Sequence, residues 1–341
     1  MDLLPTPEQE EIVTTVRSLL ERDFNLNTLA ERDGADSVVD RSLWAKCAEL
    51  GWFGLGMDES LGGVGYTLAE EALLFTEIGA HATPGPFLAT VLGARLAALS
   101  GAHDIAGAIL SGESIVALAE PHTPGAASAS PTVSGTFRVT DHGSADLILV
   151  MVGTSSALIN ASDMVAEPMA SIDLLVPIAV GTVSDVSPIA GFEENPGLAL
   201  RANILVAAEL AGIATATAEQ STQYAKDREQ FGTPIGAFQA VKHRCADMAV
   251  RAEAANSLVR YGSLAVLEGL TDANFHAHAA RSLAATYAIT NSQINVQNHG
   301  GIGFTWEHTA HRYVTRSRVR SQTLGTVQSH LQSLLDQPTP S

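Results

Sequence analysis

DREQFGTPIGAFQAVKHRCADM, residues 227–248, lies between two long helical patterns and decides how the second half of the chain folds. Apolar residues recur at helical spacing before it, from about 197 to 228, and after it, from about 236 to 269. Two further helical patterns follow at about 271–298 and 309–335. Four helices joined by short connections are expected to pack as an antiparallel bundle.

The N-terminal part of the chain is also predicted to be helical. A helix is expected from about 6 to 23, because Thr6 can cap it, Pro7 suits its first position and Gln9 completes a capping box. Further helical patterns lie at 43–50, 67–80 and 86–101. Residues 1–114 are therefore expected to form an N-terminal helical domain.

The middle of the chain has a different composition. From 115 to about 195, short β-rich runs such as SIVALAE, TFRVT and ADLILVMV alternate with clusters of Gly, Pro, Asp and Ser. This alternation is typical of antiparallel strands joined by turns. The sequence thus predicts a mostly α protein of three domains: an N-terminal helical domain (1–114), a small antiparallel β domain (115–195) and a C-terminal four-helix bundle (196–341).

The balance of charge excludes several classes of partner. The chain has 19 Lys and Arg against 37 Asp and Glu, and its net charge of −18 repels nucleic acid and anionic membranes. Hydrophobic residues make up 46% and charged residues 16%, as in a compact globular protein rather than a disordered one. We expect no nucleic-acid or membrane partner, although local Arg side chains can still bind a small phosphate-bearing ligand.

Cysteine content and apolar patterning predict a soluble, cytoplasmic protein without a structural metal. Cys47 and Cys245 have neither the spacing of a zinc site nor that of a disulfide framework. The start, MDLLPTPEQEEI, lacks the basic region and apolar run of a signal peptide. The longest apolar runs, at 147–152 and 204–208, are too short to span a bilayer.

Three segments resemble motifs of the acyl-CoA dehydrogenase superfamily. Residues 227–248 resemble its segment R-x-x-F-G-x-P-I-x-x-F-Q … A-D-M, and VQNHGGIGFTWEH at 296–308 resembles its segment Q-x-x-G-G-x-G-F/Y. LGWFGLGMDESLGGVGY at 50–66 resembles the entry turn L-G-x-x-G-L … P-E-x-x-G-G-x-G. The three matches occur in the family's order and cover most of the chain, and the β region is shorter than is usual in the family.

The resemblance implies bound FAD, extended across a boundary between subunits. By resemblance Arg228 meets the pyrophosphate, to which a guanidinium presents paired donors. Phe231 packs under the cofactor, and Gln297, Gly300 and Gly301 let the backbone approach the adenosine diphosphate closely. The alternatives are that Arg228 only forms a surface ion pair and that the two glycines only end a helix.

Two further residues are assigned to the cofactor by resemblance. Thr140, in VTDHGSAD, falls on the Thr of the family's segment I-T-N-G-x-x-A-D, which hydrogen-bonds the flavin ring. Thr326 falls on the last position of the family's segment Y-E-G-T, next to the flavin. A β-branched Thr in a strand is otherwise ordinary, so Thr140 can also be structural.

The resemblance also implies a Glu that removes the α proton of an acyl-CoA, and this chain lacks it at both positions that the family uses. Counting from Gly301 by the spacing of the commonest subfamily reaches Leu324. Counting back from Arg228 by the spacing of another branch reaches Ala202. Glu209, two turns further along the same helix, is a weak candidate for the base.

Other ionisable residues near these motifs are expected to have structural roles. Glu77 and Glu307 lie where many family members carry a Glu that is not the base. Three histidines near the glycine pair have no assignable partner and are expected to pack or lie at the surface: His299, His308 and His311.

Three functional hypotheses remain open from the sequence. In the first, the chain is a subunit without a base in a mixed acyl-CoA dehydrogenase, and a related subunit supplies the Glu. The short actinobacterial subunits that act on steroid side-chain CoA thioesters are similar in length and in lacking the Glu. The second is a self-sufficient dehydrogenase with an unusual base, and the third is a flavin-dependent monooxygenase on the same scaffold. A helical scaffold that has lost flavin is the non-enzymatic alternative.

The first two hypotheses imply the same substrate class and electron acceptor. The substrate would be an acyl-CoA thioester, and electrons would leave through an electron-transfer flavoprotein. The chain is expected to be a homo- or hetero-oligomer.

Overall fold

The computed structural model describes residues 3–29, 32–35 and 37–338, and the chain divides into two compact units. Unit 1 comprises Met1–Leu29, Ala72–Thr83 and Asn203–Ser341, and unit 2 comprises Ala30–Glu71 and Pro84–Ala202. Two helices run from unit 2 into unit 1: α4 (Leu68–Ala80) and α7 (Pro196–Asp227). The division into three domains, which followed secondary structure alone, stays a prediction.

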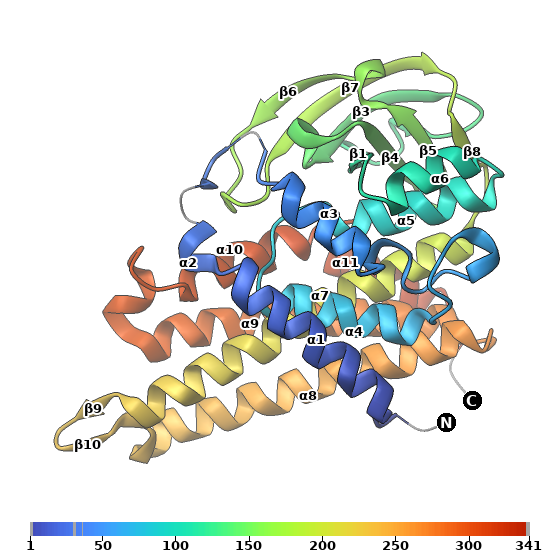
Figure 1. Ribbon diagram of the computed structural model, residues 1–341. Helices are drawn as coiled ribbons and strands as arrows, with labels where there is room; N and C mark the ends of the chain where they lie inside the picture. Colours follow the sequence, from blue (N-terminus) through green and yellow to red (C-terminus); the bar gives the residue numbers. More distant parts are fainter. Residues whose placement is uncertain (1–2, 30–31, 36, 339–341) are drawn as a thin grey trace. The chain divides into compact units, whose positions relative to one another are not determined.

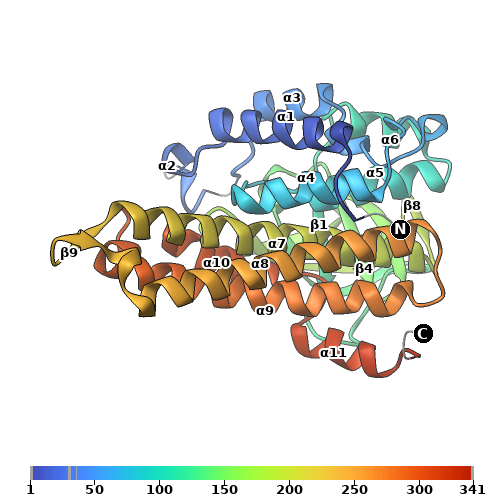
Figure 2. The same ribbon diagram turned by 90° about the horizontal axis from the view of Figure 1, so that it is seen from below.

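Unit 1 is helical. Besides the parts of α4 and α7 it contains α1 (Pro7–Asp23), α2 (Leu26–Leu29), α8 (Gln239–Leu267), α9 (Ala273–His299), α10 (Ala310–Arg320) and α11 (Val327–Leu335). Two short 3-10 helices, η6 (Ile235–Ala237) and η7 (Gly300–Phe304), precede α8 and follow α9. The long helices α7, α8 and α9 lie side by side (Figure 2), which confirms the predicted bundle.

The first helix begins where the sequence predicts. Thr6 accepts a hydrogen bond from the backbone N–H of Gln9, and the Gln9 side chain accepts one from the N–H of Thr6. This reciprocal capping box satisfies two backbone donors that the first turn would otherwise leave unpaired.

Asparagines on α9 fix its register against α7 and α8. The Asn291 amide donates to the carbonyl of Ala214 on α7 at 3.1 Å and to that of Met248 on α8 at 2.9 Å. One turn later, Asn295 accepts from the hydroxyl of Ser221 at 2.9 Å. Buried polar groups are costly unless they are paired, so a shift of α9 along its axis would be penalised.

The helices α4 and α7 cross in direct backbone contact within unit 1. A Cβ atom on Gly79 would lie 1.8 Å from the carbonyl oxygen of Glu209, and one on Gly212 would lie 1.9 Å from that of Thr76. Only glycine leaves room for this crossing at these two positions.

The predicted last helix, 309–335, is wrong as a single element. The structure has two helices there, α10 and α11, separated by a turn in which Leu324 has φ 54° and Gly325 has φ 118°. Thr326 caps α11 by accepting a hydrogen bond from the N–H of Ser329. Apolar residues continue at helical spacing through the turn, which is why the sequence pattern did not show the break.

Unit 2 contains an eight-stranded sheet, drawn in green in Figure 1. Its path is β6-β7-β3-β1-β4-β5-β8, and β2 pairs with β3. The strands are β1 (Val116–Pro121), β2 (Ala127–Ser128), β3 (Val133–Thr140), β4 (Leu147–Val152), β5 (Ser155–Asn160), β6 (Val165–Met169), β7 (Ile178–Val186) and β8 (Ala190–Phe192). The prediction that all strands pair antiparallel is wrong for one pair, because β1 and β4 are parallel. These two strands are not consecutive, and a local sequence pattern carries no information on how they pair.

One helix of unit 2 is buried around almost its whole circumference and packs on the sheet. This helix, α5 (Phe87–Leu99), contacts β1, β4, β5 and β8, and its Gly93 lies against Val116 and Leu158. A helix that is apolar all round is expected to be buried in this way. Its neighbours are α3 (Arg41–Glu49) and α6 (His103–Leu110). The sequence analysis did not predict α6 as a helix of its own.

One helix of the described residues is long and apolar enough to cross a membrane by composition. It is α7, whose most apolar 18-residue window has a mean hydropathy of 1.5. That window is 78% buried by the surrounding chain, as in the central helix of a bundle.

Candidate cofactor-binding site

A short hairpin joins α7 to α8 and carries an exposed aromatic ring at its turn. Strands β9 (Glu229–Gln230) and β10 (Thr233–Pro234) pair, and the two residues between them, Phe231 and Gly232, have φ of 55° and 77°. Two successive positive φ values are typical of the tightest hairpin turns. A bulky residue adopts this conformation only at a cost, and Phe231 is 95% exposed. The ring contacts Phe238 edge-on at 6.3 Å and otherwise faces solvent, so the strained turn makes it a candidate binding group.

Arg228 anchors this hairpin through its backbone and leaves its side chain available. Its N–H donates to the carbonyl of Tyr224, and its carbonyl accepts from the N–H of Ile235, both at 2.8 Å. Its side chain is exposed and forms no hydrogen bond or ion pair with the part of the chain that the structure describes. The interpretation of Arg228 as one half of a surface ion pair therefore has no support within this chain.

The glycine pair ends α9 and leaves open space around itself. Gly300, with φ 64°, donates its N–H to the carbonyls of Gln297 and Val296. A Cβ atom added to Gly300 or Gly301 would meet nothing within 4 Å. The turn does end a helix, and it also leaves the backbone of both glycines accessible to a ligand.

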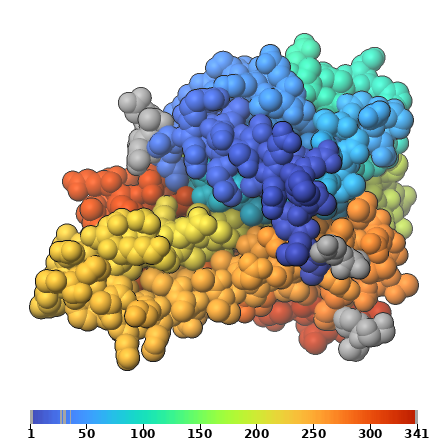
Figure 3. Space-filling model, turned by 60° about the horizontal axis from the view of Figure 1, so that its bottom comes forward, coloured from blue at the N-terminus to red at the C-terminus, as the bar shows by residue number. Residues whose placement is uncertain are grey.

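The hairpin and the glycine turn lie at one end of unit 1, which we call the bundle tip (residues 228–238 and 297–306). Tyr224, just before the hairpin, stacks on His299, just before the glycine pair, with ring centroids 4.2 Å apart. In Figure 3 a yellow region and an orange-red region of the surface lie next to each other at this end. Large apolar side chains are exposed there: Phe231, Phe238, Ile302, Phe304 and Trp306. Phe231 and Phe238 contact each other edge-on with ring centroids 6.3 Å apart. Exposed apolar groups that gather on a surface commonly mark a binding site.

The three histidines near the glycine pair pack against rings. His299 stacks on Tyr224 with ring centroids 4.2 Å apart, and His308 lies 4.3 Å from His299 on a tilted plane. His311 contacts Trp306 edge-on at 4.8 Å. Burial lowers the pKa of His299, and burial together with His299 and His311 lowers the pKa of His308. Both rings are therefore neutral at pH 7, and Arg228 rather than a histidine supplies positive charge to the tip.

The remaining two residues predicted to contact the cofactor lie outside the bundle tip. Thr140 is in unit 2, at the end of β3, is 4% exposed and pairs with Leu118 and Ile178. It is followed by Asp141, whose φ of 62° begins the turn out of the strand. Thr326 caps α11, as described above, by accepting the N–H of Ser329, and its hydroxyl can still donate a hydrogen bond.

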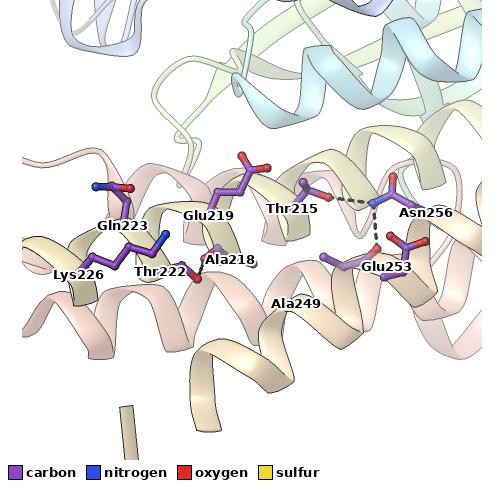
Figure 4. A pocket seen from close by; sticks show the side chains of 10 residues that line it. Thr215, Ala218, Glu219, Thr222, Gln223, Lys226, Ala249, Glu253 and Asn256 are labelled. Atoms are coloured by element: carbon purple, nitrogen blue, oxygen red, sulfur yellow. Dashed lines mark hydrogen bonds between the residues drawn. The ribbon is translucent and has the colours of Figure 1, made fainter. Parts of the chain in front are cut away.

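Two hollows were not anticipated from the sequence. A groove of about 380 Å³ between α7 and α8 is lined mainly by polar side chains (Figure 4), and Asn256 donates to Thr215 across it at 2.9 Å. A cavity of about 480 Å³ in unit 2 is lined by apolar residues of the segment 168–179 and by His142, whose pKa is lowered by burial.

Comparison with known proteins matches both ends of the chain to one family. Residues 6–106 match the model of the acyl-CoA dehydrogenase N-terminal domain, and residues 200–337 match that of the acyl-CoA dehydrogenase C-terminal domain. Acyl-CoA dehydrogenase IpdE2 of Mycobacterium tuberculosis is 33% identical over 333 residues, which cover 97% of this chain and 98% of that protein. The chain belongs to the acyl-CoA dehydrogenase family.

Solved structures agree with this family. A variant of the Tcur3481-Tcur3483 steroid ACAD superposes with a TM-score of 0.85 at 26% identity, over 96% of this chain and 97% of the other. A chain of the ChsE4-ChsE5 complex from Mycobacterium tuberculosis superposes with a TM-score of 0.88 at 23% identity, over the whole of both chains. The fold predicted from the sequence is confirmed, and the family is one of oxidoreductases.

The turn at which the sequence comparison expected the catalytic Glu contains Leu324 and is held by a buried arginine. Arg281, fully buried on α9, donates to the carbonyls of Arg320 and Thr323 at 3.0 and 2.8 Å. His330 approaches the same turn and is 2.9 Å, Nδ1 to Nδ1, from His278. Burial, Arg281 and His278 lower the pKa of His330 to about 3, so it is a poor proton acceptor.

The weak candidate base Glu209 and the carboxylate of Glu77 are both engaged in ion pairs. Glu209 is 1% exposed, and its Oε1 accepts from Nε of Arg320 at 2.6 Å. Glu77 is buried and accepts two hydrogen bonds from the guanidinium of Arg17, at 2.8 and 3.0 Å. Ala202, the second position at which the sequence comparison expected a Glu, is buried. These contacts favour structural roles for both carboxylates.

Proposed function

We propose that this chain is a subunit of an FAD-dependent acyl-CoA dehydrogenase in which it binds the adenosine end of FAD and a related partner subunit supplies the Glu base. The observation that carries the proposal is the bundle tip, where Arg228 has no partner among the described residues and the glycine turn is open. The reaction is the α,β-desaturation of an acyl-CoA thioester, and FAD, when bound, supplies the hydride acceptor.

The groups at the bundle tip fit a dinucleotide. The Arg228 guanidinium can make paired, charge-assisted hydrogen bonds to a pyrophosphate. The missing Cβ atoms of Gly300 and Gly301 leave room for a ligand to contact the backbone. The exposed ring of Phe231 can pack on a planar group, and Gln297 is exposed beside the turn to donate or accept. Thr140 and Thr326 are proposed as flavin contacts.

The partner is required by the chemistry of the first step. The α proton of a thioester is weakly acidic, so a positioned base contributes strongly to its removal. The hydrocarbon side chain of Leu324 cannot accept a proton, and Ala202 cannot either. Two of the similar structures bear paired subunit names, one of them as a steroid ACAD. Their similarity to this chain supports a heteromer and a bulky, steroid-derived acyl group.

The rest of the assignment follows the same chemistry. Electrons would leave the reduced cofactor through an electron-transfer flavoprotein. Cys47 and Cys245 are free thiols, which fits a cytoplasmic protein in a reducing compartment. The substrate's acyl-CoA would bind where the partner's base can reach its α carbon.

Anaerobic reduction by substrate tests the absence of a base. The chain alone is reconstituted with excess FAD, and a panel of acyl-CoA thioesters that includes steroid side-chain thioesters is added. We expect the visible absorbance of oxidised flavin to persist, because the isolated chain holds only one end of FAD and supplies no side chain that removes the α proton. The co-expressed heteromer is the positive control and should bleach with its substrate. Bleaching of the isolated chain at the rate of the heteromer would show that the chain has its own base.

A further inference from the structure

The two halves of the bundle tip come from different helices and meet through contacts among three rings. Tyr224 lies one turn before Arg228 on α7, and His299 immediately precedes Gly300 at the end of α9. Their rings are 4.2 Å apart with an interplanar angle of 29°. The ring of His308, from the segment after η7, lies 4.3 Å from that of His299 with an interplanar angle of 43°.

We propose that Tyr224, His299 and His308 act as a ring clamp that holds the Arg228 hairpin and the Gly300–Gly301 turn in the relative position needed to bind one dinucleotide. The clamp rests on the proposed function, because it positions the residues assigned there to FAD. Its three members are positioning residues: each acts through the backbone segment to which it is attached.

Each ring is tied to a binding segment by its own backbone or by a hydrogen bond. The Tyr224 carbonyl accepts the N–H of Arg228 at 2.8 Å, so a displaced Tyr224 displaces the start of the hairpin. Nδ1 of His299 lies 2.8 Å from the carbonyl of Asn295, which identifies Nδ1 as the protonated nitrogen and fixes the ring. Asn295 in turn accepts from Ser221 on α7, so the same two helices are joined again one turn deeper.

The third ring is placed by a close backbone approach. A Cβ on Gly303 would lie 2.8 Å from the Val296 carbonyl and 3.0 Å from Cβ of His299, so η7 folds tightly back on the end of α9. This return brings His308 against His299. His299 is 4% exposed, so the ring contacts exclude water between the two segments.

Contact between aromatic rings, rather than the mere filling of space, is what holds the clamp together in this proposal. Ring pairs at these distances have an attraction beyond the burial of their area. Two variants of His299 separate the two properties: His299→Phe keeps a ring, and His299→Leu fills much of the space without one. Both lose the hydrogen bond to Asn295, so this loss cancels in the comparison.

The first measurement is the FAD dissociation constant of the co-expressed complex, with thermal stability measured in parallel. His299→Leu should weaken FAD binding about three- to tenfold relative to His299→Phe. The matched control is His276→Leu, which removes another His–Tyr ring contact between α8 and α9, with Tyr261 at 4.5 Å. It should lower stability and leave FAD affinity unchanged. Equal FAD affinity in the Leu and Phe variants of His299 would overturn the clamp.

The second measurement does not depend on FAD. Amide hydrogen exchange in residues 229–235 of the full chain should accelerate in His299→Leu and stay close to the wild-type rate in His299→Phe. The same exchange rate in both variants would overturn the clamp even if the wild-type complex held no FAD. Suppose that the wild-type complex holds no FAD and that hydrogen exchange in the hairpin still accelerates only in His299→Leu. This result would contradict the proposed function but support the clamp.

Discussion

Arg228→Ala is expected to weaken FAD binding by the assembled dehydrogenase about 10- to 150-fold. A charge-assisted hydrogen bond contributes about 1.5–3 kcal/mol, and each 1.4 kcal/mol is a tenfold change in affinity. The guanidinium is exposed and has no partner among the described residues, so its removal should leave the thermal midpoint of the protein unchanged. The measurement is a flavin titration of the purified complex, with thermal unfolding in parallel.

Three further variants separate the geometry of this contact from its charge. Arg228→Lys keeps the charge without the paired donors and should bind FAD with intermediate affinity. Arg22→Ala removes an exposed positive charge from α1 and should leave FAD affinity unchanged. Gly301→Ala places a methyl group in open space, so it should weaken FAD binding without lowering stability. Arg228→Ala with the FAD affinity of the wild type would contradict the cofactor assignment.

Glu209→Ala is expected to lower the free energy of unfolding by about 3–5 kcal/mol. Its carboxylate is paired with Arg320, and both side chains are almost fully buried, so the substitution removes the carboxylate that faces a buried guanidinium in the bundle interior. Thermal or denaturant unfolding measures the loss. Glu209→Gln retains a hydrogen-bond acceptor of similar shape and should cost less.

The matched control is the exposed member of a surface ion pair. Arg22 pairs with Asp23 at 2.9 Å at the end of α1 and its side chain is 62% exposed, so Arg22→Ala should leave stability nearly unchanged. A Glu209→Gln variant that is as stable as the wild type but cannot be reduced by acyl-CoA would contradict the structural role and identify Glu209 as a base.

The sequence predicts those parts of the fold that local signals encode. The capping residues Thr6 and Gln9 place the start of α1, and sustained apolar spacing places α7, α8 and α9. The sequence does not predict the break between α10 and α11, because Leu324 adopts a left-handed backbone conformation that is unusual for leucine. The parallel pairing of β1 and β4 also depends on contacts between distant parts of the chain.

The candidate site, too, could be predicted from the sequence only in part. Arg228 and the glycine pair stand in recognisable motifs, and the structure brings both motifs to the bundle tip. The contacts that hold them there join residues far apart in the sequence, as between Tyr224 and His299. The partner of Glu209 is likewise distant, on α10, so only the structure could show that this carboxylate is neutralised by Arg320.

Flavin content with and without a partner tests the central claim most directly. The chain is purified alone and again after co-expression with a family member that carries the Glu, and flavin absorbance is measured per mole of protein. We expect little flavin in the isolated chain and a stoichiometric amount in the heteromer, because the bundle tip binds one end of a cofactor whose other end the partner holds. Full flavin occupancy of the chain alone, unchanged by the partner, would contradict the account.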